Sequence, residues 1–391
     1  MTRTDQHTNR SKYLHRALAA PGALVACLAA TAFLAASAPA KPTTTDTNPS
    51  RLQTDVNALV AAGAPGAILL VRDGNRTVRL TAGLSNLAPK TPMRPDDHFK
   101  TASLTKSYTA TVVLQLVGEG KLGLDDAIEQ RLPRVVPNGE KISIRQLLNH
   151  TSGLADFESN PRYLKPYLSG NFGYYRSPRQ LVELGISQKP LFAPGARHSY
   201  SNTNYVVAQL IVEKITGKPL GIELKRRIFQ PLRLRETSYP TKPGLPSPYA
   251  HGYRLFGKPP LIDVSGLSPS AAPGSGAILS TVRDLADFYR ALLTGRLLRP
   301  DLLKAMKTMV AAGGRDAGAA GYGLGLMRWP TACGSAWGHD GGIAGYWVRS
   351  ISTENGQRQA VLMINQDADT LAKPAQIVFE RLIAKAYCNP G

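Results

Sequence analysis

The chain has 391 residues, of which 43% are hydrophobic and 19% charged, and its formal net charge is +20. This is the composition of a soluble globular protein with a large core. The basic residues form no stripe with interleaved aromatic residues, so the charge does not predict a nucleic-acid partner. The seven histidines show no metal-ligand spacing, and no nucleotide-binding motif is present, so we expect neither a metal nor another cofactor.

The N-terminus has the pattern of a secretory signal. Four basic residues precede an apolar stretch, residues 17–36, which ends in small residues. We predict that residues 1–40 form a signal peptide, cleaved after Ala38 or Ala40, which leaves a secreted protein without a membrane span. A retained membrane anchor and lipidation at Cys27 are the alternatives. The basic residues are Arg3, Arg10, Lys12 and Arg16.

Residues 41–51, rich in Thr and Pro, predict a disordered linker, and we expect the folded domain over residues 52–391. Hydrophobic periodicity and turn residues predict helices and strands towards both ends of this domain, with an irregular, mostly helical region between them. The expected helices are residues 52–62, 104–117, 206–216, 277–293 and 373–387. The expected strands are residues 67–71, 77–82, 322–326, 345–352 and 359–365.

Strands that lie at the two ends of the sequence must share one sheet. We therefore predict an α/β fold with an antiparallel sheet flanked by helices and an inserted, mostly helical lobe. The α/β lobe is expected over about residues 52–115 and 270–391, and the helical lobe over about residues 116–269. A site is expected where the lobes meet, since pockets usually form at such junctions.

A serine and a lysine lie one helical turn apart at the start of the second expected helix. Ser103 and Lys106 share one helix face, so their side chains can touch. A serine hydroxyl becomes a good nucleophile when a neighbour accepts its proton, and burial or a nearby cation can prepare a lysine for this role. The backbone N–H of Ser103 would also lie at the positive end of the helix, where an oxyanion is stabilised. The alternative is a helix-capping serine followed by a surface lysine.

Tyr200 and Asn202 form a second motif. Tyr200 can carry a proton if a nearby ammonium lowers its pKa. Asn202, two residues further along an extended segment, projects to the same side and could orient Lys106 and a substrate amide. A half-buried structural tyrosine is the alternative.

Longer runs of sequence surround these motifs. Because of these runs and the motifs they contain, the chain closely resembles the serine β-lactamase and penicillin-recognising superfamily over about residues 52–386. The resemblance is to the branch of class C β-lactamases and D-alanyl-D-alanine carboxypeptidases. The resemblance implies a β-lactamase/transpeptidase-like fold. The runs are Ile144–Leu154, Phe192–Gly195, Tyr200–Tyr205, Ile228–Leu232, Ser280–Ala286, Tyr322–Leu326 and Gly338–Gly342.

The resemblance also implies roles for the motif residues. Ser103 would be the nucleophile, Lys106 its activating lysine and Tyr200 a proton shuttle. Asn202 would complete the second motif. The third motif would be a strand beside the serine with His339 and Gly341, followed by the second oxyanion amide at Gly342. Many relatives carry lysine where this chain has His339, and a structural histidine is the alternative here.

The activity implied by the resemblance is hydrolysis through an acyl-enzyme on Ser103. We expect a D-alanyl-D-alanine carboxypeptidase that acts on peptidoglycan stem peptides, with β-lactams as covalent ligands. A class C-like β-lactamase and an esterase of small acyl substrates would use the same groups and are the alternatives. A cell-wall-binding protein that has lost activity is a remote alternative.

Asp340 and Arg328 bear on how a carboxypeptidase would bind the terminal carboxylate of its substrate. Relatives use a hydroxyl at the middle of the third motif, where this chain has Asp340, or an arginine on the preceding strand. Here the nearest arginine is Arg328, one residue beyond the matching position. We expect Arg328 to be the carboxylate partner and activity on D-alanyl-D-alanine to be weak, because an ionised Asp340 would repel the substrate. The alternative is that Asp340 faces solvent and pairs with surface arginines.

Cys333 and Cys388 are the cysteines that remain after removal of the signal. An even pair in an exported protein predicts a disulfide, with two separate buried thiols as the alternative.

The strongly basic charge predicts attraction to anionic polymers of a cell wall. A surface charge that only maintains solubility is the alternative.

Overall fold

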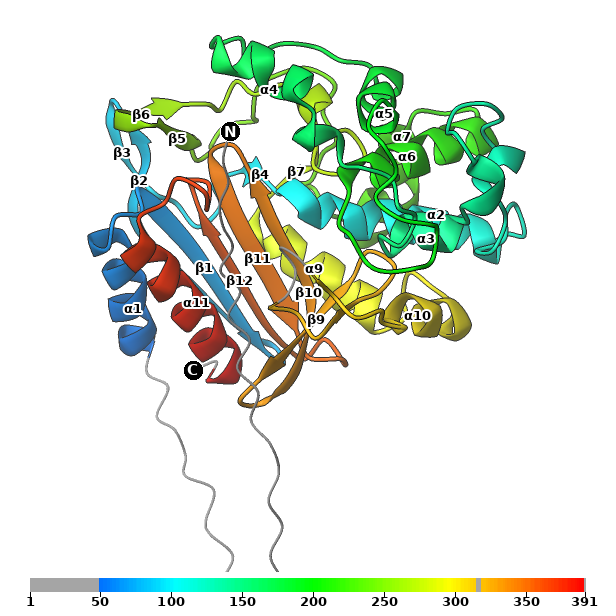
Figure 1. Ribbon diagram of the computed structural model, residues 1–391. Coiled ribbons are helices and arrows are strands. Elements are labelled where there is room, and N and C mark those ends of the chain that lie inside the picture. The colour runs from blue at the N-terminus through cyan, green and yellow to red at the C-terminus, as the bar shows by residue number, and fades with distance from the viewer. Residues whose placement is uncertain (1–48, 314–317, 390–391) are drawn as a thin grey trace, which may run out of the picture. The chain divides into compact units, whose positions relative to one another are not determined.

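Figure 1 shows the computed structural model, which describes residues 49–313 and 318–389. The expected signal peptide and residues 41–48 of the expected linker lie outside the described residues. Pro49–Arg51, which we expected in the linker, form the first turn of helix α1 (Pro49–Ala61). Proline is favourable at a helix start, since the N–H it lacks would have no helical acceptor there. In the two described segments no helix is long and apolar enough to cross a membrane.

Strands from both ends of the chain form one antiparallel sheet, as the sequence predicts. Its eight strands lie in the order β3-β2-β1-β12-β11-β10-β9-β8. The early strand β1 is central and pairs with the late strand β12, which joins the two ends of the sequence in one layer. The strands are β1 (Gly66–Asp73), β2 (Arg76–Leu87), β3 (Lys90–Pro92), β8 (Gly321–Tyr322), β9 (Met327–Thr331), β10 (Gly334–Ile343), β11 (Tyr346–Ser352) and β12 (Arg358–Ile364).

The mostly helical lobe occupies the middle of the chain and is built around α2 and α6. Most residues of α2 are buried, as expected for a helix at the centre of a lobe. Helix α6 ends at Gly217, whose φ of 66° is a left-handed conformation that glycine adopts without strain. The helices of this lobe are α2 (Thr105–Gly118), α3 (Ile144–Leu148), α4 (Pro161–Leu168), α5 (Pro178–Ile186), α6 (Asn202–Thr216), α7 (Leu220–Leu224) and α8 (Gln230–Leu232).

Three further helices and two short ribbons complete the fold. The helices are α9 (Val282–Leu293), α10 (Pro300–Lys307) and α11 (Lys373–Cys388). The ribbons are the pair of β4 (Phe99–Lys100) with β7 (Leu279–Ser280) and the hairpin of β5 (Tyr253–Phe256) with β6 (Lys258–Asp263).

Both faces of the central strands β1 and β12 are buried, which explains the continuous apolar run in β1. Leu69 of β1 and Leu362 of β12 point to one face and pack with apolar residues of α1 and α11. Ile68 and Met363, one residue away on the same strands, point to the opposite face, whose core includes residues of α9 and α2. Figure 1 shows α1 and α11 on one side of the sheet and α9 on the other. A strand with helices on both faces needs apolar residues at every position.

Three expected elements differ from the structure. The helix expected over residues 206–216 begins at Asn202, so Asn202 is not in an extended segment as we expected; Ser201 is the last extended residue before the helix. Residues 277–281 are not helical, because Leu279 and Ser280 pair with β4, and α9 begins at Val282. The expected strand 322–326 ends after Tyr322. Residues 323–326 make a turn to β9, in which Gly325 has a φ of +75° that disfavours a strand.

Cys333 and Cys388 form a disulfide, with their Cα atoms 5.5 Å apart. Cys333 lies in the turn between β9 and β10, and Cys388 is the last residue of α11. The bond therefore ties the strand that carries His339 to the last helix.

Candidate active site

Ser103 lies in a tight 3-10 turn, Ala102–Leu104, between β4 and α2. Ala102 has a φ of 51°, a left-handed conformation that is strained for a residue with a side chain and is often found at functional sites. The Thr101 hydroxyl donates to the carbonyl of Ile278 at 3.1 Å and fastens the turn. Ser103 therefore lies at the N-terminal end of α2, where backbone N–H groups have no acceptor within the helix.

Lys106 is fully buried and touches Ser103, as their spacing predicts. Its Nζ donates to Ser103 Oγ at 3.0 Å, to Asn202 Oδ1 at 2.7 Å and to the carbonyl of Ser275 at 2.9 Å. An ammonium has three N–H bonds, and these acceptors match all three. The network fixes Nζ beside the serine hydroxyl, where a lysine must be to exchange a proton with it.

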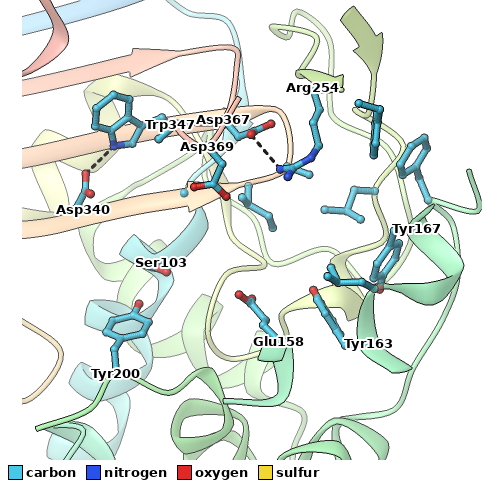
Figure 2. A pocket seen from close by; sticks show the side chains of 18 of the residues that line it. Ser103, Glu158, Tyr163, Tyr167, Tyr200, Arg254, Asp340, Trp347, Asp367 and Asp369 are labelled. Atoms are coloured by element: carbon cyan, nitrogen blue, oxygen red, sulfur yellow. Dashed lines mark hydrogen bonds and ion pairs between the residues drawn. The ribbon is translucent and has the colours of Figure 1, made fainter. Parts of the chain in front are cut away.

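Tyr200 also lies close to the ammonium group of Lys106. The ring centroid of Tyr200 is 4.8 Å from Lys106 Nζ, and Figure 2 shows its hydroxyl pointing towards Ser103. The ring stacks on His150 with centroids 4.2 Å apart and an interplanar angle of 30°. His150 is itself fixed, since its Nδ1 lies 3.1 Å from the backbone N of Ser201 and 3.1 Å from the side-chain amide of Asn204.

Asn202, at the start of α6, is held in one orientation by a carboxylate. Its Nδ2 donates to Asp156 Oδ2 at 3.0 Å, while its Oδ1 accepts from Lys106. An ionised carboxylate only accepts hydrogen bonds, so Asp156 selects the amide orientation that presents the oxygen to Lys106.

The third motif lies on β10, next to the Ser103 turn. Pairing of β10 with β9 ends at Gly338, so beyond this residue the strand has β11 on one side and the turn on the other. At Gly341 a Cβ would lie 2.7 Å from the carbonyl oxygen of Thr101, so only glycine lets the strand come this close. Gly342 and Ser103 line the same cavity, which brings the two expected oxyanion donors together.

His339 is buried, and both of its ring nitrogens have protein partners. Nε2 lies 2.8 Å from the hydroxyl of Tyr322, and Nδ1 donates to the backbone carbonyl of Asp340. A lysine at this position would offer three N–H donors on a flexible stem. The imidazole, in contrast, has no nitrogen left to donate to a substrate.

Asp340 pairs with Arg349. Arg328, which we expected to bind the carboxylate of a substrate, lies elsewhere. Asp340 Oδ1 accepts from Arg349 Nε at 3.1 Å and from Trp347 Nε1 at 3.1 Å. Arg349 stands directly opposite Asp340 on β11, whereas Arg328 stands opposite Trp337 and covers its ring at 5.7 Å. Arg328 is absent from the described lining of the cavity, so the structure does not support it as the carboxylate partner.

A cavity of about 530 Å³ opens in front of Ser103 (Figure 2). One wall is apolar and comes from α4, the loop after it and β5. The rest carries four carboxylates and, among the described lining residues, one guanidinium, Arg254, which donates to Asp367 at 3.0 Å. The apolar wall is Tyr163, Leu164, Tyr167, Leu168, Phe172 and Phe256, and the carboxylates are Glu158, Asp340, Asp367 and Asp369.

Several histidine and tyrosine rings next to the motif residues pack against one another. The Tyr322 ring lies 4.7 Å from that of His150 and 5.6 Å from that of His198. Burial lowers the pKa of His198 to about 4, so this ring is uncharged at neutral pH.

Comparison with known proteins identifies the family. The family model described as β-lactamase matches residues 52–384, and the chain belongs to this family. It is accordingly a serine hydrolase.

Solved structures that resemble the chain include two amide hydrolases. A D-stereospecific amidohydrolase from Streptomyces sp. is 38% identical, with a TM-score of 0.79 over 87% of this chain and 98% of that one. A D-amino acid amidase from Ochrobactrum anthropi SV3 is 28% identical, with a TM-score of 0.77 over 85% of this chain and 96% of that one. Among curated proteins, penicillin-binding protein 4* of Bacillus subtilis is 26% identical over 78% of this chain and 69% of its own length.

The sequence analysis did not identify four residues that position the side chains of the site. His150 stands inside the run Ile144–Leu154, and its place in that run was the available signal. Tyr322 likewise stands inside a matching run, but was interpreted only as a strand residue. No sequence pattern links Asp156 to Asn202 or Ser275 to Lys106, because these contacts bridge 46 and 169 positions of the chain.

Proposed function

We propose that this protein is an exported serine amidase or peptidase that cleaves amide bonds of D-amino acids through an acyl-enzyme on Ser103. The observation that carries the proposal is the 3.0 Å contact of Lys106 Nζ with Ser103 Oγ, on the wall of a cavity that Tyr200 also lines. The two amide hydrolases of D-amino acids named above support the substrate class.

The reaction begins with attack of Ser103 Oγ on the substrate carbonyl. The hydroxyl proton passes to the pair of Lys106 and Tyr200, and the backbone N–H groups of Ser103 and Gly342 stabilise the oxyanion. The C–N bond then breaks, and the leaving amine takes the proton. A water molecule, deprotonated by the same pair, attacks the acyl-enzyme, and Ser103 regains its proton as the acid is released.

The charge of the cavity favours a substrate with an ammonium group over one with a carboxylate. Four carboxylates line it, and two of them are paired with guanidinium groups, Asp340 with Arg349 and Asp367 with Arg254. The negative charge that faces a substrate therefore comes mainly from Glu158 and Asp369. His339 has no nitrogen left to bind a carboxylate, and Arg254 is already paired with Asp367. At intermediate dielectric, two like charges about 4 Å apart repel by about 1 to 4 kcal/mol, enough to decide between the two substrate types.

D-Alanyl-D-alanine carboxypeptidase activity on peptidoglycan stem peptides is the second candidate. It is favoured by the similarity to penicillin-binding protein 4* and by the motifs that this chain shares with the penicillin-recognising superfamily. In this case β-lactams would acylate Ser103. β-Lactamase and esterase activity remain alternatives on the same groups.

A matched substrate panel tests the proposal. We expect D-phenylalanine amide to be turned over with a kcat/KM at least about tenfold above that of its N-acetyl derivative, in which the ammonium charge is replaced by a neutral amide. The panel also contains diacetyl-lysyl-D-alanyl-D-alanine, a cephalosporin and a p-nitrophenyl ester. Faster turnover of the carboxylate-bearing peptide than of either amide would contradict the proposal and establish the second candidate.

Export and wall association are part of the same proposal. They are supported by the basic, apolar and small-residue order of residues 1–40 and by the net charge of +20. The expected result is a secreted enzyme that sediments with isolated cell walls in low salt and is released as ionic strength rises. Sedimentation that does not change with salt would contradict electrostatic attraction.

A further inference from the structure

A second lysine is buried beside the nucleophile, and the mechanism does not use it. Lys100 ends β4, three residues before Ser103, and is 5% exposed. Its Nζ donates to the backbone carbonyl of Leu267 at 2.7 Å. Burial lowers the pKa of Lys100 to about 8, although the field of Asp263 opposes this shift. The fold therefore keeps a positive charge in a place that disfavours it.

The surroundings of Lys100 would accept an apolar side chain. Leu279, Ile343, Ala277 and Pro240 line the same small cavity of about 10 Å³. Replacing a buried charge with an apolar group of similar volume is often neutral or stabilising. Packing alone therefore gives no reason for a cation at this position.

The carbonyl that Lys100 binds belongs to a segment, residues 267–275, that reaches both the cavity and the catalytic lysine. Leu267, at its start, lines the cavity in front of Ser103. Ser275, at its end, offers its carbonyl to Lys106 Nζ. Two lysine ammoniums, three residues before and three residues after Ser103, thus hold the two ends of one segment.

We propose that Lys100 is a positioning residue of the Ser103 site: its ammonium fixes the Leu267 carbonyl and thereby sets the segment that presents the Ser275 carbonyl to Lys106. This inference rests on the proposed role of Ser103 as nucleophile. Without the Lys100 contact, residues 267–275 keep the bonds from Lys106 and Thr109 at their end but lose the bond at their start, and Lys106 loses a fixed acceptor. The amine then spends less time beside Ser103 Oγ, and acylation slows.

Hydrogen exchange tests the structural half of the proposal without any substrate. In Lys100→Met we expect amides of residues 267–276, including the bonded N–H groups of Ser268 and Gly276, to exchange at least about tenfold faster than in the wild type. Amides of β1 and β12 should be unchanged. Lys100→Arg, which keeps a cationic donor, should restore protection. Lys121→Met, which removes a half-exposed lysine, is the charge control.

The rate of acylation tests the functional half. With a fluorophosphonate that labels Ser103, we expect the labelling rate of Lys100→Met to fall about 10- to 100-fold, with rescue in Lys100→Arg and with KM for the amide substrate nearly unchanged. Unchanged exchange in residues 267–276, or faster exchange throughout the sheet, would overturn the positioning role. Unchanged labelling of Ser103 despite faster local exchange would overturn it as well. A wild-type protein that is never labelled at Ser103 would instead contradict the proposed function, while the exchange result would still decide whether Lys100 holds the segment.

Discussion

The two regions that the sheet separates are buried in different ways. Under α1 and α11 the interior is apolar, and Trp347 stacks on Phe379 there with ring centroids 3.7 Å apart. Around α2 the interior holds many polar groups, among them Thr105, Lys106 and Ser107, all less than 1% exposed. The first region is held by the removal of apolar surface from water, and the second needs a hydrogen-bond partner for each buried polar group. Changes in the first region should therefore alter stability, and changes in the second should alter chemistry.

The largest expected effect is that of Ser103→Ala. Removal of the hydroxyl deletes the nucleophile and should lower kcat by at least about 10⁴-fold without unfolding the protein, because Ser103 is only partly buried. Turnover of the amide substrate and circular dichroism check this result. Ser169→Ala, a change at an exposed serine after α4, is the matched control and should keep labelling at Ser103. Wild-type turnover in Ser103→Ala would contradict the mechanism.

A substitution in the apolar region under α1 and α11 should lower stability and leave catalysis unchanged. Leu382 of α11 is 1% exposed within the apolar cluster, and Leu382→Ala should lower the free energy of unfolding by about 2 to 5 kcal/mol. The kcat per folded molecule should stay within a factor of about two. Denaturant unfolding and active-site titration measure the two quantities. A large loss of kcat in fully folded enzyme would show that the two regions are coupled.

Acid should destabilise the polar region through His198. Burial holds the pKa of His198 at about 4, below its unfolded value of about 6.5, so only the unfolded chain binds a proton between these values. The stability from this group is complete above pH 6.5 and is lost as pH falls towards 4, by about 2 to 3 kcal/mol. His198→Gln should reduce the dependence of unfolding free energy on pH by about one proton in this range. An unchanged slope would show that His198 takes up a proton in the folded state.

The smallest expected effect concerns the orientation of Asn202. Asp156→Asn replaces a group that only accepts with one that can also turn an NH2 towards Asn202, so the amide orientation is no longer selected; kcat should fall about tenfold while the free energy of unfolding changes little. Asp125→Asn, which alters an exposed carboxylate paired with Arg145, is the control. A kcat equal to that of the control would mean that Lys106 alone orients Asn202.

Much of the site could be predicted from the sequence, because several of its residues lie close together along the chain. Ser103 and Lys106 are three residues apart at a helix start, and helical geometry alone brings them into contact. Strands at the two ends of the sequence were also predicted to share one antiparallel sheet, and the eight-stranded sheet confirms this prediction. The glycine at position 341 belongs to the third motif, but only the structure shows that a Cβ would collide with Thr101 there.

The charges of the site were decided by the tertiary structure. The sequence predicted that Arg328 binds the carboxylate of a substrate, because Arg328 lies close to the third motif along the chain. In the sheet, however, Arg349 stands opposite Asp340, and Arg328 stands opposite Trp337. Electrostatic partners depend on distances of a few ångströms, and across strands these distances are set by register, which local sequence patterns do not specify. The sequence alone therefore determined the contact between Ser103 and Lys106 and the shared sheet, while the pairing of Asp340, the orientation of Asn202 and the burial of Lys100 depend on contacts between distant segments.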